Sequence, residues 1–353
     1  MHPIERSKAF CEDYGLSIPI VMAPMAGACP AKLAASVSNA GGMGSCGALL
    51  LNPEQISSWT EQFRAESNGA FMLNNWIPDP APERNQQNED AVRQFLGQFG
   101  PEVAADAADA APLSFDDQCR AMLEARPHVI SSIMGLYRPK FVSQMKALDI
   151  KWFATVTSLT EALMAVEAGA DALVVQGSES GGHRGNFASS YDQSAGLMSL
   201  IPVIADAVNI PLIATGGISD SRTISAALIL GASAVQMGTG LLRTPEAAIA
   251  PAWAEAIGKT RPEDTIITRS FSGKPGRAVR NAYTDASHSA NTPDPAPYPI
   301  QRALTQAMRT KATKENNIEA MQAWAGQSAV LSKDTDAQDL ITQMWDEVTS
   351  LMK

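Results

Sequence analysis

Short apolar runs alternate with helix-like segments along most of the chain. Eight such runs are rich in small, branched and apolar residues, and the stretches between them carry helical spacing of apolar residues. Near-continuous apolar character is typical of strands buried on both faces, as in parallel sheets. The expected strands are Ile18–Met25, Gly42–Leu49, Ala70–Trp76, Val129–Met134, Lys151–Thr157, Ala172–Gln176, Pro211–Thr215 and Ala234–Met237.

Helix start signals lie between these runs. Ser158-Leu-Thr-Glu161 has the pattern of a capping box and precedes the periodic stretch EALMAVEAGA. Ser219–Leu230 repeats the same arrangement, and a glycine ends each helix before the strands in GADALVV and GASAVQM. Eight strand–helix units of this kind predict an α/β protein with a parallel (β/α)8 TIM barrel.

Two segments do not fit the alternation. Pro78–Pro112 is rich in Pro, Asp, Ala and Gln, and the tail from about Leu242 holds helices, a basic turn and a Pro-rich stretch. Insertions after barrel strands usually lie over the face where active sites form. We expect a barrel domain made of residues 1–75, 113–242 and 325–353, and a smaller helical and loop cap made of 76–112 and 243–324. A peripheral decoration is the alternative.

One glycine motif points to a different fold. Gly42-Met-Gly-Ser-Cys-Gly47 matches G-x-G-x-x-G, but a dinucleotide-binding fingerprint follows a strand and opens a helix. Here the motif follows a helical pattern and leads into a strand. The glycines are therefore expected to allow close helix-to-strand packing.

Composition narrows the class of partner. The 353-residue chain is 45 % hydrophobic and 18 % charged, with a net charge of −10. That charge argues against a nucleic-acid or anionic membrane surface. Cys11, Cys29, Cys46 and Cys119 show no C-x-x-C spacing, as expected for reduced, packed thiols. With no leader pattern or membrane-spanning run, a cytoplasmic protein is expected.

Amides and glycines gather at the ends of the expected strands. They are Asn74-Asn75 after strand three, Gln176 after strand six, Gly216-Gly217 after strand seven and Gly238-Thr239 after strand eight. Asn and Gln suit the edge of a flat heterocycle, and bare backbone after the last two strands suits a phosphate. We expect a planar, phosphate-bearing cofactor, FMN, at this face. Simple glycine turns are the alternative.

His183 is the candidate catalytic residue. It follows Gly181-Gly182 in the loop VVQGSESGGHRG, just beyond the sixth strand, whereas the other histidines lie away from strand ends or in polar segments. An imidazole there can exchange a proton near neutral pH. Glu179 and Arg184 are candidates to orient it or to bind an anion. No second His or Cys lies at ligand spacing, so no metal site is expected.

Several segments together resemble the nitronate monooxygenase family, formerly called 2-nitropropane dioxygenases. They are PIVMAPMAGA, VVQGSESGGHRG, LIATGGI, ALILGASAVQMGT, SFSGKPGRAVRN and WAGQS. The resemblance runs from about Pro19 to Gln327, and the loop Q-G-x-E-x-G-G-H-R-G is its most specific element. It implies a flavin-dependent TIM barrel, a flavoprotein oxidoreductase that oxidises alkyl nitronates with O2.

The resemblance also implies roles for individual residues. His183 matches the family's catalytic histidine, while the fourth strand carries SSIMG where many members have a histidine or an aromatic residue, and Ser180 replaces a usual alanine. The first departure leaves the substrate open. The implied FMN-binding residues are Met22, Ala23, Pro24, Asn74, Gln176, Gly181, Gly182, Gly216, Gly217, Gln236, Met237, Gly238 and Thr239.

The leading hypothesis is an FMN-dependent monooxygenase. It would convert an anionic nitronate, for example propionate 3-nitronate, and O2 into a carbonyl product and nitrite. His183 would stabilise the anion if cationic, or deprotonate a nitroalkane if neutral. Lys274, Arg277 and Arg280 either attract a substrate carboxylate or form a solvated basic turn.

Two other functions stay open. On the same scaffold, NAD(P)H could reduce the flavin, which would then reduce a quinone or an enoyl thioester. A phosphate-binding barrel without redox chemistry is the third hypothesis. The oligomeric state is also open, with a homodimer among the options.

Overall fold

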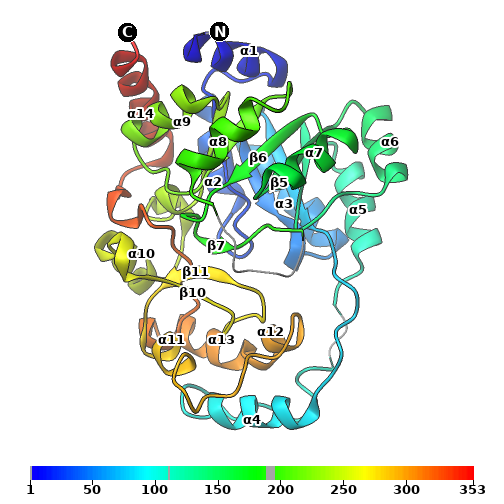
Figure 1. The fold of residues 1–353 in the computed structure, drawn as a ribbon, viewed down its shortest axis with the longest axis vertical. Helices are drawn as coiled ribbons and strands as arrows, with labels where there is room; N and C mark the ends of the chain where they lie inside the picture. Colours follow the sequence, from blue (N-terminus) through cyan, green and yellow to red (C-terminus); the bar gives the residue numbers. More distant parts are fainter. Residues whose placement is uncertain (1, 110–111, 188–194) are drawn as a thin grey trace.

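Eight parallel strands form one sheet that closes on itself at the centre of the molecule (Figure 1). The computed structural model describes residues 2–109, 112–187 and 195–353. The strand order is β1-β9-β8-β6-β5-β4-β3-β2. A parallel bridge between Val21 and Met43 joins β1 to β2, and the Met22 N–H donates to the Met43 carbonyl over 2.8 Å. The predicted (β/α)8 TIM barrel is confirmed.

All eight expected strands are present, although several are shorter than predicted because their ends turn into loops. The barrel strands are β1 (Ile20–Met22), β2 (Gly44–Gly47), β3 (Phe71–Trp76), β4 (Val129–Ile133), β5 (Lys151–Val156), β6 (Ala172–Gln176), β8 (Leu212–Thr215) and β9 (Ala234–Met237). The glycine motif at Gly42–Gly47 enters β2 from a helix, as expected. A Cβ on Gly44 would lie 2.4 Å from the Ala34 carbonyl oxygen, so this glycine permits close helix-to-strand packing.

Helices surround the barrel and continue beyond one end of it. The helices around the barrel wall or across its amino-terminal end are α1 (Pro3–Tyr14), α2 (Ala31–Asn39), α3 (Pro53–Glu66), α5 (Phe115–Glu124), α6 (Pro139–Ala147), α7 (Leu159–Glu167), α8 (Leu197–Ala205), α9 (Ser221–Leu230) and α14 (Ala337–Leu351). The others are α4 (Gln86–Leu96), α10 (Pro251–Lys259), α11 (Ala282–Ser287), α12 (Ile300–Leu304) and α13 (Gln306–Lys314). None of the helices in the described residues is long and apolar enough to cross a membrane.

The capping box predicted at Ser158 is only half formed. The Ser158 hydroxyl accepts the Glu161 N–H over 3.2 Å at the start of α7. The Glu161 carboxylate, however, accepts from the Thr157 N–H over 2.6 Å and from the Phe187 N–H over 2.7 Å. It therefore ties the end of β5 to the loop after β6 instead of closing the capping box.

The barrel interior is apolar at its amino-terminal end. Inward side chains of the strands, including Val174 and Ile213, form one buried cluster with Phe10 and Tyr14 of α1. The Tyr14 and Phe153 rings meet edge to face with centroids 5.0 Å apart. Because α1 closes this end, only the carboxyl ends of the strands are left to hold a ligand.

A second, antiparallel sheet lies beyond the carboxyl ends of the barrel strands. It has the order β10-β11-β7, formed by β10 (Thr265–Thr268), β11 (Gly276–Val279) and β7 (Gly182–His183). In Figure 1 it lies between the barrel and the group of helices α4, α11, α12 and α13. This sheet was not predicted from the sequence, in which the residues of β11 were expected to form part of a basic turn.

The sheet and these helices share a hydrophobic cluster separate from the barrel core. Val92 and Leu96 of α4 belong to it together with Phe271, Leu304 and Met308. The insertion after β3 and the carboxyl-terminal tail therefore pack against each other although they are far apart in the sequence.

Candidate active site

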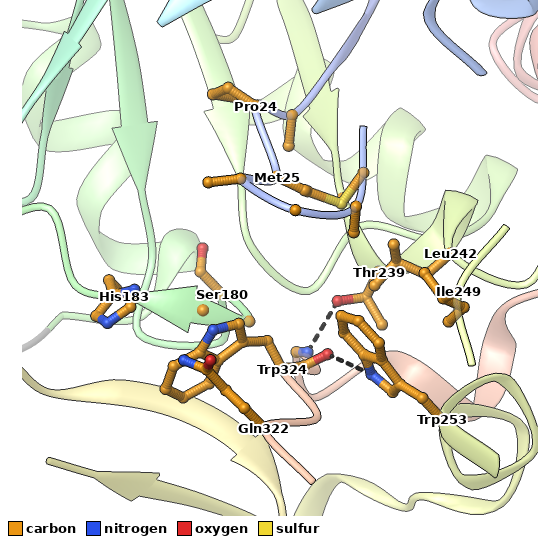
Figure 2. A pocket seen from close by; sticks show the side chains of 18 of the residues that line it. Pro24, Met25, Ser180, His183, Thr239, Leu242, Ile249, Trp253, Gln322 and Trp324 are labelled. Atoms are coloured by element: carbon orange, nitrogen blue, oxygen red, sulfur yellow. Dashed lines mark hydrogen bonds between the residues drawn. The ribbon is translucent and has the colours of Figure 1, made fainter. Parts of the chain in front are cut away.

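A cavity of about 700 Å³ opens at the carboxyl ends of the barrel strands. Its walls come from the ends of β1, β3, β6, β8 and β9, from the loop after β6, and from α12, α13 and residues 321–328. Figure 2 shows His183 and Ser180 on one side of this space, Pro24 and Met25 above it, and Trp253 on the other side. The cavity thus lies where a TIM barrel holds its active site.

The alternation of side chains along each strand explains the polar lining. On β6, Val174 faces the apolar barrel core, so Gln176 two residues later also points inward, at the cavity. Ile213 and Thr215 on β8 follow the same rule. The last inward position of several strands is therefore polar, and these side chains form the cavity floor.

The expected catalytic histidine and almost all residues expected to bind the cofactor border this cavity. They are Ala23, Pro24, Asn74, Gln176, Gly181, Gly182, His183, Gly216, Gly217, Gln236, Gly238 and Thr239. Met22 and Met237 do not. Both are fully buried in the cluster between the strands and the outer helices. They pair with each other across β1 and β9, so their side chains point away from the cavity.

Gly216 and Gly217 give the cavity a bare backbone edge. Their φ angles are +115° and +68°, in the region that favours glycine. The N–H groups of Gly217, Gly238 and Thr239 make no hydrogen bond to any described residue. A cavity edge with free N–H groups is suited to the oxygens of a phosphate.

The amide side chains of Asn74 and Gln236, at the cavity floor, have different atoms free to bind a ligand. The Asn74 side-chain N–H2 donates to the Ser131 hydroxyl over 2.9 Å, which leaves its oxygen toward the cavity. The Gln236 amide makes no side-chain hydrogen bond within the described part of the chain, and it also borders the cavity. These groups can bind the edge of a heterocycle.

Gln176, which was expected to contact the cofactor, borders the cavity and also holds the loop after β6. Its N–H2 donates to the His183 carbonyl over 3.1 Å, and its oxygen accepts the Gly185 N–H over 2.8 Å. The last residue of β6 therefore holds the loop that follows it. Pairing of His183 with Gly276 of β11 fixes the same loop from the other side.

The His183 side chain is held by one hydrogen bond and two aromatic rings. Its Nε2 lies 2.7 Å from the Ser272 Oγ. The Trp76 ring meets it edge to face with centroids 4.7 Å apart, and the Trp324 ring does so at 4.8 Å. Since the ring is half-buried and borders the cavity, it presents a fixed imidazole to a ligand.

This environment keeps the imidazole neutral. Burial, followed by the positive charges of Lys274, Arg302 and Arg309, lowers the pKa of His183 from its ordinary value of 6.5 to about 3. The hypothesis of a cationic His183 that stabilises a bound anion does not agree with this environment.

Glu179 and Arg184, expected to assist His183 or bind an anion, make other contacts. The Glu179 carboxylate accepts the Leu197 N–H over 2.9 Å at the first residue of α8. Arg184 is buried and donates to the Gly177 carbonyl over 2.6 Å. Both residues therefore stabilise the loop after β6.

The cations of the expected basic turn are also engaged elsewhere. The Arg277 guanidinium donates to the Ser178 carbonyl over 2.9 Å. Lys274 forms an ion pair with Asp79 at 2.6 Å. Arg280 pairs with Asp285 at 2.5 Å on the surface. None of these three cations is among the residues that line the cavity.

Different cations line the cavity instead. Arg302 of α12 and Arg309 and Lys314 of α13 border it. None of these three residues was predicted at the site from the sequence. The spacing of polar residues along Gln306–Lys314 is helical, but this pattern is the same for a face in water and for a face toward a cavity.

The departures from the family pattern also lie here. The Ser180 hydroxyl is buried and donates to the Thr215 carbonyl over 3.3 Å. Ile133, within SSIMG on β4, lines the cavity. An aliphatic side chain of SSIMG therefore forms part of the cavity wall. Within the described residues, no group of His, Cys, Asp and Glu side chains could hold a metal ion.

The barrel, its ligand-sized cavity and the fixed histidine define an enzyme of the TIM-barrel class. Comparison with known sequences gives the family. The model of the nitronate monooxygenase family matches residues 10–347, so the chain belongs to this oxidoreductase family. A probable nitronate monooxygenase of Staphylococcus aureus (strain Newman) is 33 % identical over 348 residues, 96 % of each chain.

Solved structures give the same result for the fold. A nitroalkane oxidase from Streptomyces ansochromogenes superposes with a TM-score of 0.86 at 28 % identity, covering 96 % of this chain and 98 % of that one. FabK from Thermotoga maritima superposes with a TM-score of 0.76 at 27 % identity, covering 97 % and 96 %.

Proposed function

We propose that this protein is an FMN-dependent nitronate monooxygenase that oxidises alkyl nitronates with O2 to a carbonyl product and nitrite. The observation that carries the proposal is a single cavity with a free backbone edge for a phosphate and a neutral, fixed histidine. Family membership supports the same reaction class.

The residues present fit FMN. The free N–H groups of Gly217, Gly238 and Thr239 would hold the phosphate, and the amides of Asn74 and Gln236 would bind the ring edge. Ala23 and Pro24 would line the ring. When bound, FMN supplies the redox chemistry of the reaction, and the protein supplies position and electrostatics.

The low pKa of His183 favours a nitronate substrate over a neutral nitroalkane. A general base works best when its pKa lies near the operating pH, and a pKa of about 3 makes a weak base. Removal of a proton from a nitroalkane carbon would demand a stronger one. We therefore assign His183 the role of a neutral hydrogen-bonding and packing group beside a substrate that arrives already as the anion.

The expected division of the chain into a barrel and a cap agrees with this role of His183. Residues 76–112 and 243–324 would form a cap that covers the strand ends and excludes water from the reacting groups. Trp76, Trp324 and the α12–α13 face supply that part of the cavity wall.

An anaerobic experiment tests the proposal. The purified, flavin-loaded protein is mixed separately with propionate 3-nitronate, with the parent nitro compound, and with NADH or NADPH, while the flavin absorbance is followed. We expect a rapid change with the nitronate alone, and nitrite release when O2 is admitted. Fast bleaching by NAD(P)H without a response to nitronate would assign the protein to the quinone or enoyl-thioester reductases instead. A colourless protein that does not take up FMN would exclude both.

A further inference from the structure

One face of α13 turns a polar and cationic surface toward the cavity. Its cavity-lining residues are Gln306, Arg309, Thr310, Thr313 and Lys314. Spacings of three and four residues place them on one side of the helix, over about 12 Å of its length. Arg302 of the neighbouring α12 extends this face toward His183, whose imidazole its charge acts on.

The positive charges on this face are not neutralised by acidic residues. No carboxylate of a described residue lies within ion-pair distance of Arg302, Arg309 or Lys314. The nearby Lys274, in contrast, pairs with Asp79 at 2.6 Å. The whole chain carries 37 acidic and 27 basic residues, so unpaired cations around one cavity are not explained by a shortage of acids.

The Arg309 guanidinium is fixed in position by neutral groups. It donates to the Gln322 side-chain oxygen over 3.0 Å, to the Arg302 carbonyl over 2.8 Å and to the Gln306 side-chain oxygen over 2.8 Å. Its Nε donates to the Thr305 hydroxyl over 3.0 Å. These contacts hold the group in place without cancelling its charge, which is how a preorganised binding group is built.

The Arg302 side chain is different. It is half-buried, and it makes no side-chain hydrogen bond within residues 2–109, 112–187 and 195–353. It can therefore turn its paired N–H groups onto a ligand in the cavity. A guanidinium matches a planar group with two oxygens better than a single point charge does.

We propose that Arg302 and Arg309 form an anion subsite that binds the planar, two-oxygen anionic group of the substrate. A nitronate and a carboxylate share this chemistry. The inference rests on the proposed function and deepens it, since it names the residues that hold the substrate's charge. His183 is not available as the counter-charge because its imidazole is neutral, and Lys274 is already paired with Asp79.

A binding measurement tests the subsite apart from turnover. Propionate and nitrite are titrated calorimetrically into the flavin-loaded wild type and into Arg302→Gln, Arg302→Lys and Arg280→Gln. Arg280→Gln removes the same charge from the surface, outside the cavity. We expect Arg302→Gln to weaken binding of at least one of the two anions about 10- to 100-fold, because a hydrogen bond to a charged group is lost. Arg302→Lys should be intermediate, and Arg280→Gln should stay within about twofold of wild type.

Two nitronates then separate the sources of the anion. Propane-2-nitronate has only the nitronate group, whereas propionate 3-nitronate has a carboxylate as well. A rise in KM for both in Arg302→Gln means that the subsite holds the nitronate, and a rise for the second alone means that it holds the carboxylate. Unchanged KM values and unchanged anion binding would overturn the proposal. If wild type oxidises neither nitronate but still binds propionate through Arg302, the proposed function fails and the subsite stands.

Folding of the variants is checked by thermal melting. Arg302→Gln replaces a side chain that makes no hydrogen bond to the described residues, so we expect a Tm close to that of wild type. Arg302→Lys gives a second test that keeps the charge.

Discussion

His183 of β7 and Ser272, in the segment before β11, are joined side chain to side chain at 2.7 Å, next to the antiparallel pairing of β7 with β11. The same Ser272 hydroxyl receives the Lys274 N–H over 3.3 Å. Ser272 is thus a positioning residue, which holds the imidazole and is itself held by the following turn.

Ser272→Ala should lower kcat about three- to tenfold, because one neutral hydrogen bond, worth about 1 kcal/mol, no longer orients the ring. Ser272→Thr keeps the hydroxyl and should recover most of the activity. His183→Asn should lower kcat further. Steady-state kinetics on a nitronate measure these effects.

Ser270→Ala is the matched control for this pair. The Ser270 hydroxyl accepts from Thr268 over 2.9 Å, two residues away from Ser272. Its loss should reduce stability and leave kcat unchanged. Equal kcat values for Ser272→Ala and wild type would show that Ser272 does not position the histidine.

The pH dependence should lack the inflection expected of an ordinary histidine. Because the pKa of His183 lies at about 3 in the folded protein, the imidazole stays neutral as pH falls through 6.5. Protonation of His183 should therefore cause no loss of activity between pH 8 and about 5. The pH profiles of wild type and His183→Asn should have the same shape in this range. An NMR titration of the His183 ring, assigned with the same variant, measures the pKa directly.

The lowered pKa of His183 also makes the free energy of unfolding depend on pH. The unfolded chain takes up a proton at His183 near pH 6.5, whereas the folded protein does so only near pH 3. The contribution of neutral His183 to stability is therefore full above pH 6.5 and is lost as pH falls toward 3. In Arg302→Gln the His183 pKa should rise, since one repelling charge is gone. A pKa unchanged by that variant would contradict the electrostatic account.

Gly217→Ala should release FMN. Its φ of +68° costs an alanine about 1–2 kcal/mol, and the new Cβ would lie 3.1 Å from the Glu179 Cβ, at the proposed phosphate edge. Gly15→Ala is the control, because Gly15 has φ +67° with nothing within 4 Å and ends α1 at the other end of the barrel. The flavin-to-protein ratio should fall only for Gly217→Ala, while urea unfolding should show a similar loss for both. An equal ratio in the two variants would place the phosphate elsewhere.

Arg277→Gln should destabilise the fold without altering substrate preference. This buried guanidinium joins the Ser178 carbonyl to the Thr265 hydroxyl, at 2.9 Å and 2.8 Å. Loss of hydrogen bonds from a charged donor should lower the free energy of unfolding by about 1.5–3 kcal/mol. The ratio of kcat/KM for propionate 3-nitronate and propane-2-nitronate should stay as in wild type. A fall in kcat/KM for propionate 3-nitronate alone would show that Arg277 binds the substrate carboxylate.

The barrel was predictable because each of its strands is a compact apolar run followed by a helix signal. The amides and glycines at the strand ends were predictable for the same reason, since parallel strands bring their carboxyl ends to one face. Met22 and Met237 were expected at the cavity because they adjoin its residues in the sequence motifs. Side chains alternate along a strand, however, and these two point away from the cavity.

The second sheet and the cationic face were not predictable in the same way. β7 has two residues, and β11 begins at a glycine after Lys274 and Pro275, so neither shows an alternating pattern. Arg302 and Arg309 lie on helices whose polar faces would normally meet water. Only the packing of α12 and α13 over the barrel turns that face inward.

The pairing of β7 with β11 also has a consequence for the time at which the site forms. His183 and Ser272 are separated by 89 positions in the chain, and Arg302 and Trp324 follow still later. During synthesis these contacts cannot form before the later segments exist, because the chain is made from its amino terminus. During synthesis, the barrel strands up to β9 can therefore assemble before the histidine acquires its partners. The site becomes competent only when the last part of the chain has been made.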